Sequence, residues 1–261
     1  MPGQSSIIKG GAFDGMELSE FWKYHAVKYG FIADYQFPLL VKLISSKDKL
    51  SVQVHPNDRY ANENYGKFGK FECWYILKAN EGKITVGTNC ETLEELQQAI
   101  DQNKVEDYLN ECSVKKGDLV VIKPGTIHAI HKDTFVLEVQ EPSDITYRLY
   151  DYNREPKREL HIKEAMDVIN IDREEKIYHF DKTKHFLSNH FNLKKKVIKN
   201  FAVLKDIKGK AFIVLSGRGK VNNQEVKPYD SFIVDRNEKC LFIFGKIELL
   251  IVDSKTRRMK Q

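Results

Sequence analysis

The stretch KKGDLVVIKPGTIHAI (residues 115–130) indicates the fold of this chain most clearly. It runs from a basic residue to an aspartate, an apolar strand, a Pro-Gly turn and a second apolar strand. The same order, with a different turn in place of Pro-Gly, recurs in VKPYDSFIVDRNEKCLFIF (residues 226–244). Short apolar strands separated by turns are typical of antiparallel barrels. The recurrence predicts two similar β halves, and because only the first keeps a histidine after its turn, the chemistry is predicted in the N-terminal half.

The composition excludes several classes of protein. With 261 residues, of which 41% are hydrophobic, the chain can bury a full core. The formal charge of +5 is small, and the most basic cluster, residues 194–196, lacks the interleaved aromatics of a nucleic-acid surface. No apolar run reaches membrane-spanning length and no secretory leader pattern is present, so we expect a cytoplasmic protein with no membrane partner. The four cysteines lack C-x-x-C spacing, which favours reduced thiols.

The pattern of the chain predicts strands with a few short helices. Helices are expected over residues 17–29 ending at Gly30, over 91–100 with Thr92 as N-cap and Glu95 completing a capping box, and over 160–169. Strands are expected from Phe37 onward, and both halves are interpreted as antiparallel β. We therefore predict an all-β-dominated chain divided into residues 1–165 with a helical insertion near 91–110, a connecting segment 166–195, and a C-terminal β-barrel half 196–261 without metal ligands.

Polar side chains interrupt the apolar strands of the first half. In KLSVQVHPNDRY (residues 49–60), Val52 and Val54 share one face, while Gln53 and His55 share the other. Taken alone, this pattern also fits an amphipathic strand whose polar face meets water.

A carboxylate and a second histidine add to this set. Glu72 lies inside an aromatic run and shares a face with Trp74, where a buried carboxylate needs a cation or donors nearby. His128 follows the Pro-Gly turn, and taken singly it also fits a structural histidine. Two imidazoles, a carboxylate and an amide oxygen on three strands suit a divalent metal with an open position, because a barrel interior brings such side chains together.

Four segments in this order resemble the type I mannose-6-phosphate isomerases, in their short bacterial form built from cupin barrels. The likeness covers about residues 5–170, and it rests on SVQVHPND (51–58), GKFECWYIL (69–77), KPGTIHAI (123–130) and SDITYRLYDYNR (143–154). The resemblance implies two cupin-like (jelly-roll) β-barrels with a few short helices. It also implies one Zn²⁺ per chain and a small-molecule sugar-phosphate substrate. The zinc ligands that it implies are Gln53, His55, Glu72 and His128, and the catalytic residues are Arg148, Lys70, Glu138 and Asp144, of which Arg148 and Lys70 also bind substrate.

The implied reaction interconverts mannose 6-phosphate and fructose 6-phosphate by moving a proton between C1 and C2 through a cis-enediol. A zinc ion polarises the substrate oxygens, and Arg148 offers a fork of donors to the developing negative charge. An apolar setting would raise the pKa of Glu138 toward a value useful for acid–base catalysis. The simpler alternatives are that Arg148 pairs with Asp144 across a strand bend and that Lys70 is solvated.

Two other functions stay open at this point. Two histidines and a carboxylate also describe the metal site of iron(II)-dependent cupin oxygenases. The protein could also be a catalytically weak module that binds sugar phosphates without turning them over.

One departure from the family concerns the N-terminus. The family normally begins with a Trp-Gly-Gly segment and a strand carrying Glu-x-Trp, and nothing before Ser5 matches them. We expect one strand pair and an active-site aromatic to be absent. An open sheet edge would then be covered by a loop, by a rearranged N-terminus or by a partner chain, and the last of these would make a homo-oligomer.

Overall fold

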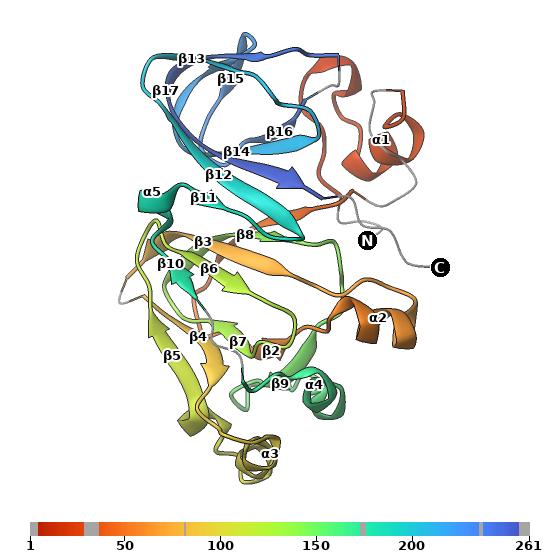
Figure 1. The fold of residues 1–261 in the computed structure, drawn as a ribbon, viewed down its shortest axis with the longest axis vertical. Coiled ribbons are helices and arrows are strands. Elements are labelled where there is room, and N and C mark those ends of the chain that lie inside the picture. Colours follow the sequence, from red (N-terminus) through yellow and green to blue (C-terminus); the bar gives the residue numbers. More distant parts are fainter. Residues whose placement is uncertain (1–4, 29–36, 81, 173–175, 235–236, 256–261) are drawn as a thin grey trace. The chain divides into compact units, whose positions relative to one another are not determined.

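The computed structural model describes residues 5–28, 37–80, 82–172, 176–234 and 237–255 (Figure 1). Its contacts divide the chain into two compact units. The central unit is formed mainly by Leu39–Thr183, and the terminal unit joins the residues up to Pro38 to Lys184–Arg258. These limits differ from the predicted 1–165 and 196–261, because helix α1 (Leu18–Tyr24) groups with the C-terminal strands. The expected fold class is confirmed: strands predominate, helices are few and the sheets are antiparallel. The two-barrel description stays a prediction.

The central unit consists of two five-stranded antiparallel sheets whose inner faces share one core (Figure 1). Trp74 and Val120 of the first sheet pack in the same buried cluster as Ile84 and Ile130 of the second. The first sheet has the order β1 (Leu40–Ser45), β8 (Thr134–Gln140), β3 (Glu72–Ala79), β6 (Leu119–Ile122) and β10 (Ile177–Tyr178). The second has the order β5 (Leu109–Ser113), β4 (Lys83–Thr88), β7 (His128–Ile130), β2 (Val52–Val54) and β9 (Tyr147–Tyr150).

Helices cover the outer face of the second sheet. Leu96 of α3 (Leu93–Asp101) and Ala165 of α4 (Ile162–Val168) pack in one buried cluster with Val52, Val54 and Leu149. The alternation of residues 52–54 therefore places valines toward these helices and Gln53 toward the core between the sheets. The short helices η2 (Val105–Tyr108) and α5 (Phe180–Thr183) complete the unit, together with α2 (Asp58–Tyr65).

The capping box predicted for α3 is present in modified form. Thr92 Oγ1 accepts a hydrogen bond from the Glu95 N–H at 3.1 Å, while the Glu95 carboxylate accepts from Glu91 rather than from Thr92 itself. Helix α2 was not predicted, although Asn57 caps its start and Gly66 ends it in the left-handed region.

The terminal unit contains one seven-stranded antiparallel sheet with its own buried core. Its longest strand is β17 (Leu241–Ser254). The helix expected over 17–29 is only α1, preceded by η1 (Gly11–Phe13), and Tyr29 and Gly30 lie outside the described residues. The other strands are β11 (His185–Phe186), β12 (Phe191–Ile198), β13 (Phe201–Leu204), β14 (Lys210–Val221), β15 (Gln224–Val226) and β16 (Ser231–Ile233).

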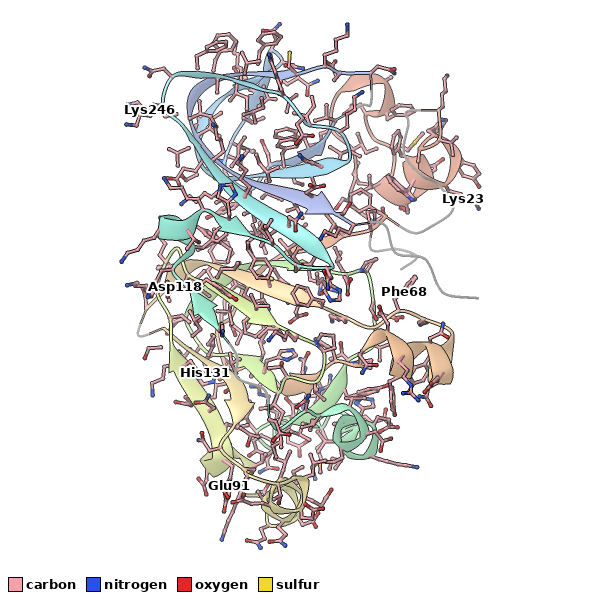
Figure 2. The ribbon with its side chains drawn as sticks, in the orientation of Figure 1. Lys23, Phe68, Glu91, Asp118, His131 and Lys246 are labelled. Atoms are coloured by element: carbon pink, nitrogen blue, oxygen red, sulfur yellow. The ribbon has the colours of Figure 1, made fainter. Side chains whose placement is uncertain are left out.

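The recurring sequence pattern forms the same aspartate turn in both units, ending at Asp118 (Figure 2) and at Asp230. In each turn, Oδ2 of the aspartate accepts from the N–H of the lysine three residues earlier, at 3.0 and 2.9 Å. The residue before each aspartate has a positive φ, +89° for Gly117 and +73° for Tyr229. In each unit, one residue of a bulged neighbouring strand makes two backbone hydrogen bonds to the turn, one as donor and one as acceptor, at 2.7 to 2.9 Å. This residue is Ile76 in the central unit and Val214 in the terminal unit.

Among the described residues, none of the helices combines the length and the apolar character that crossing a membrane requires.

Candidate metal centre and active site

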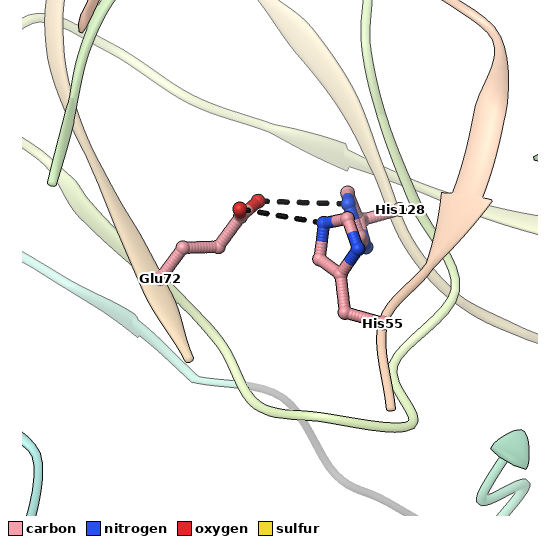
Figure 3. A group of neighbouring side chains, drawn as sticks. All are labelled: His55, Glu72 and His128. Atoms are coloured by element: carbon pink, nitrogen blue, oxygen red, sulfur yellow. Dashed lines mark ion pairs between the residues drawn. The ribbon is translucent and has the colours of Figure 1, made fainter. Parts of the chain in front are cut away.

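His55, Glu72 and His128 converge inside the central unit (Figure 3). One donor atom from each lies within 4.8 Å of the other two. The Nε2 atoms of His55 and His128 face opposite oxygens of the Glu72 carboxylate, at 3.4 and 3.5 Å. All three side chains are buried, with at most 3% of any residue exposed. The convergence expected from the sequence is present for these three residues.

The strands bring these side chains together from both sheets. Glu72 begins β3 in the first sheet, whereas His128 begins β7 in the second and His55 directly follows β2. The Gly125 N–H donates to the His55 carbonyl at 2.8 Å, which ties the turn before His128 to the end of β2. The two imidazoles therefore face the carboxylate across the core between the sheets.

The hydrogen bonds leave the metal-facing atoms free. His128 Nδ1 lies 2.9 Å from the Thr126 carbonyl, so this nitrogen carries the proton and Nε2 presents its lone pair toward Glu72. Within the described part of the chain, His55 Nδ1 and Glu72 Oε2 are buried without a hydrogen-bond partner. Buried polar atoms without a partner are costly, and a bound cation would satisfy the carboxylate oxygen.

The protonation states suit metal binding. Burial, with a contribution from the Lys70 charge, lowers the pKa of His55 to about 3. Burial also lowers the pKa of His128. Although burial opposes ionisation of Glu72, His55, His128 and Lys70 hold the pKa of its carboxyl well below its usual range. Near neutral pH the site thus offers two neutral imidazoles and a carboxylate, the forms in which these groups bind metals.

Gln53 lies beside this group. It is paired with His128 of β7 on one side and with Arg148 of β9 on the other. Directly opposed residues share a face of the sheet, so all three point to the same side. Gln53 Nε2 donates to Ser51 Oγ at 2.9 Å, which leaves the amide oxygen as its acceptor end.

A buried carboxylate outside the group belongs to Glu138. Its two oxygens accept from Lys42 Nζ at 2.8 Å and from Trp74 Nε1 at 3.1 Å, and the three residues are cross-strand neighbours on β1, β8 and β3. Burial, together with the Glu72 charge, raises the pKa of Glu138. Lys42 was not among the predicted site residues. The sequence feature that could have identified Lys42 is its place in an apolar run, on the same strand face as Leu40 and Ile44.

Lys70 is buried, not solvated, with 6% of its surface exposed. Its Nζ donates to Thr146 Oγ1 at 3.2 Å and lies 3.9 Å from Glu72 Oε2. Burial lowers the pKa of Lys70, while the Glu72 charge opposes that effect. This lysine therefore places a cation beside the carboxylate of the candidate metal centre.

Arg148 and Asp144 do not form the alternative pair with each other. Arg148 Nη1 donates to the Glu159 carbonyl at 2.6 Å, and its buried Nε has no partner in the described residues. Asp144 is half exposed, and Lys67 Nζ donates to both of its oxygens at 3.0 Å. That hydrogen bond holds the pKa of Asp144 below its usual range. A catalytic role for Asp144 stays a prediction.

A tight backbone crossing joins the segments that carry the candidate ligands. A Cβ atom on Gly69 would lie 2.4 Å from the Asn57 carbonyl carbon, so the two chains pass too closely for any other residue. The Lys70 N–H donates to the Pro56 carbonyl at 3.1 Å, and the Gly69 N–H donates to Asp58 Oδ1 at 2.9 Å. The crossing closes the loop that contains α2 and fixes Lys70 close to the start of β3.

Comparison with known sequences agrees with this arrangement. Residues 1–104 match the family model described as "Phosphomannose isomerase type I, catalytic domain". Over 241 residues the chain is 37% identical to "Mannose-6-phosphate isomerase ManA" of Bacillus subtilis, and the alignment covers 86% of the chain and 76% of that protein. Over 177 residues it is 41% identical to a Streptococcus mutans "Mannose-6-phosphate isomerase", of which it spans 56%, while 66% of the chain is covered.

Solved structures extend the comparison. The crystal structure of mannose 6-phosphate isomerase from Bacillus subtilis aligns with a TM-score of 0.86 at 30% identity, covering 95% of this chain and 85% of that one. A mannose 6-phosphate isomerase bound with zinc and yttrium aligns with a TM-score of 0.68 at 14% identity, covering 93% and 87%, which is a likeness of fold alone. With this identity to ManA across most of both proteins, the chain belongs to the type I phosphomannose isomerase family and is an isomerase of that family.

Proposed function

We propose that the protein is a zinc-dependent isomerase that interconverts mannose 6-phosphate and fructose 6-phosphate through a cis-enediol. The observation that carries the proposal is the buried group of His55, Glu72 and His128, whose donor atoms lie within 4.8 Å of one another. The names of the relatives supply the substrate, and the site supplies a chemistry that fits it.

The proposed zinc ligands are Gln53, His55, Glu72 and His128, with one zinc per chain. The nitrogen and oxygen donors suit Zn²⁺, and the buried Glu72 Oε2, which has no hydrogen-bond partner among the described residues, suits a cation ligand. The solved isomerase that holds zinc is a further reason to choose this metal. When bound, zinc supplies a Lewis acid that polarises the carbonyl and hydroxyl oxygens of the sugar.

Two cations of the chain are proposed to hold the substrate oxygens. Lys70 offers a buried point charge 3.9 Å from Glu72 Oε2. Arg148 has an Nε–H without a partner among the described residues and lies in register with Gln53. Preorganised donors of this kind favour the transition state, because they meet the negative charge as it develops on the enediol oxygens.

Glu138 is proposed to move the proton. It is a buried carboxylate outside the ligand set, and Lys42 and Trp74 fix both of its oxygens. In the forward direction it would take the proton from C2 of the aldose and return it to C1 of the enediol, while the C1 oxygen gains a proton and the C2 hydroxyl loses one, which leaves the ketose. Lys42 would adjust its basicity, since a nearby cation favours the charged form of a carboxyl group.

The test is an isomerase assay on purified protein with mannose 6-phosphate, before and after treatment with a chelator. We expect turnover, its loss on chelation and its return with added zinc. Elemental analysis should give one zinc per chain. Absence of turnover with retained binding of the sugar phosphate would point to a binding module.

A second candidate function follows from the same three residues. Two histidines and one carboxylate also form the site of iron(II) oxygenases. Stoichiometric iron together with oxygen consumption, and no isomerase activity, would favour that function over the proposed one.

A further inference from the structure

The outer edge of strand β9 is closed at Arg148 by a single residue, His161. In the sheet order β9 lies at the end, next to β2. On its open side the His161 N–H donates to the Arg148 carbonyl at 2.8 Å, and the Arg148 N–H donates to His161 Nδ1 at 3.3 Å. The imidazole thus supplies the acceptor that a neighbouring strand would normally supply.

The same short segment also holds the side chain of Arg148. The Glu159 carbonyl, two residues before His161, accepts from Arg148 Nη1 at 2.6 Å. Backbone and guanidinium are therefore fixed by one stretch of three residues, 159–161. The buried Nε has no hydrogen-bond partner in the described structure, and it is the donor proposed to face the substrate.

The segment is itself anchored at both ends. Before it, Arg158 donates through Nε to Asp151 Oδ2 at 2.7 Å and through Nη2 to the other oxygen, and Asp151 directly follows β9. After it, His161 begins α4, where its carbonyl accepts from the N–H of the fully buried Ala165 at 2.9 Å. Residues 159–161 consequently have little freedom to move along the edge of the sheet.

We propose that His161 is a positioning residue that directs the Arg148 guanidinium, with Nδ1 acting as a hydrogen-bond acceptor. The inference rests on the proposed function, in which Arg148 stabilises the enediol. An error of about 1 Å in the position of a catalytic group can cost about a hundredfold in rate. Because Arg148 keeps its bond to Glu159, the expected loss is smaller, about tenfold in kcat, with little change in KM.

Two substitutions that resemble histidine in shape separate the effect of the hydrogen-bond acceptor from that of side-chain volume. His161→Leu fills the same space without a hydrogen-bond acceptor, whereas His161→Asn keeps an oxygen for the Arg148 N–H. We expect kcat to fall about tenfold in His161→Leu and to be largely restored in His161→Asn, with zinc content unchanged in both. Lys163→Ala is the control, since it removes an exposed side chain of α4. It should match wild type.

A double-mutant cycle with Arg148→Ala tests whether His161 acts through the arginine. In the Arg148→Ala background, His161→Leu should have no further effect on kcat. An equal loss in both backgrounds, or loss of folding in His161→Leu while His161→Asn folds, would overturn the inference. If Arg148→Ala is impaired and His161→Leu is normal, only this inference fails. If Arg148→Ala turns over normally, the proposed role of Arg148 fails as well.

Hydrogen–deuterium exchange provides a readout that needs no turnover. The Arg148 amide should exchange faster in His161→Leu than in wild type, and at the wild-type rate in His161→Asn. Equal exchange in all three proteins would mean that the bond to Nδ1 does not hold the strand edge.

Discussion

Glu72 shows at the scale of single residues why a metal is expected here. It is a carboxylate only 1% exposed, and Oε2 has no hydrogen-bond partner in the described part of the chain. A buried ion with an unsatisfied atom costs several kcal/mol. His55 and His128 are uncharged near neutral pH and cannot neutralise it, while Lys70 is 3.9 Å away. A dication among the three would remove this cost.

Replacing His128 with alanine should abolish metal binding and turnover. Loss of a supporting residue behind a metal ligand typically costs 10- to 100-fold in affinity, and loss of a ligand itself should cost at least about a hundredfold. The fold should survive, because His128 is one residue of a core that spans two sheets. Elemental analysis and circular dichroism measure the two effects. His179→Ala, at an exposed histidine bonded to Asp118, is the control and should keep its zinc. Full zinc content in His128→Ala would contradict the ligand assignment.

Replacing Arg148 with lysine should lower kcat about a hundredfold and leave KM within a few fold. Lysine keeps the charge but loses the fork of donors, so the loss of about 3 kcal/mol falls on the transition state. Steady-state kinetics with mannose 6-phosphate measure the split. A raised KM with normal kcat would assign Arg148 to substrate anchoring alone.

The sequence predicted the three converging residues for an identifiable reason. A charged or imidazole side chain inside an apolar strand must find a partner, and Glu72 and His128 stand in such strands. Lys42 meets the same criterion but was not predicted, because its role depends on Glu138, a cross-strand neighbour 96 residues away. The pairing of Asp144 with Lys67 likewise depends on a contact between distant segments that no local pattern reveals.

At the scale of elements, the loop between β2 and β3 limits which substitutions the site tolerates. The predicted strands were found because their alternation is local, whereas α2 was missed because its eight residues carry a weak apolar pattern. Its signals were the cap at Asn57 and the final Gly66. The crossing at Gly69 was beyond prediction, since it depends on the close approach of Pro56 and Asn57 in space.

Gly69→Ala should destabilise the protein by about 2 kcal/mol and also lower kcat. The new Cβ would overlap the backbone at Asn57, and the resulting shift falls on Lys70. Gly66→Ala is the matched control. With φ at +61° and nothing within 4 Å of its Cβ, it should cost about 1 kcal/mol without affecting kcat. Urea unfolding and kinetics of both variants measure the difference, and equal kcat in the two would contradict the coupling to the site.

At the scale of the whole molecule, all proposed zinc ligands lie in the central unit. The terminal unit has its own buried cluster and, within its described residues, no comparable group of metal-binding side chains. Metal removal should therefore act on one unit. Chelation should speed amide exchange in β2, β3 and β7 by removing the stabilisation that binding confers. Exchange in β14 and β17 should stay the same, and mass spectrometry of peptic fragments measures both. Uniform acceleration would mean that the units unfold together.

The aspartate turn occurs in both units, and its two copies meet different constraints. In the central copy a side chain at Gly117 would meet the Asp181 carboxylate at 2.5 Å, so that carboxylate would have to shift. The terminal copy carries Tyr229 at nearly the same backbone angle, where a side chain costs about 1 kcal/mol. The glycine of the central copy therefore suggests a substitution for the terminal copy. Tyr229→Gly should raise the free energy of unfolding by up to about 1 kcal/mol, as urea titration would measure.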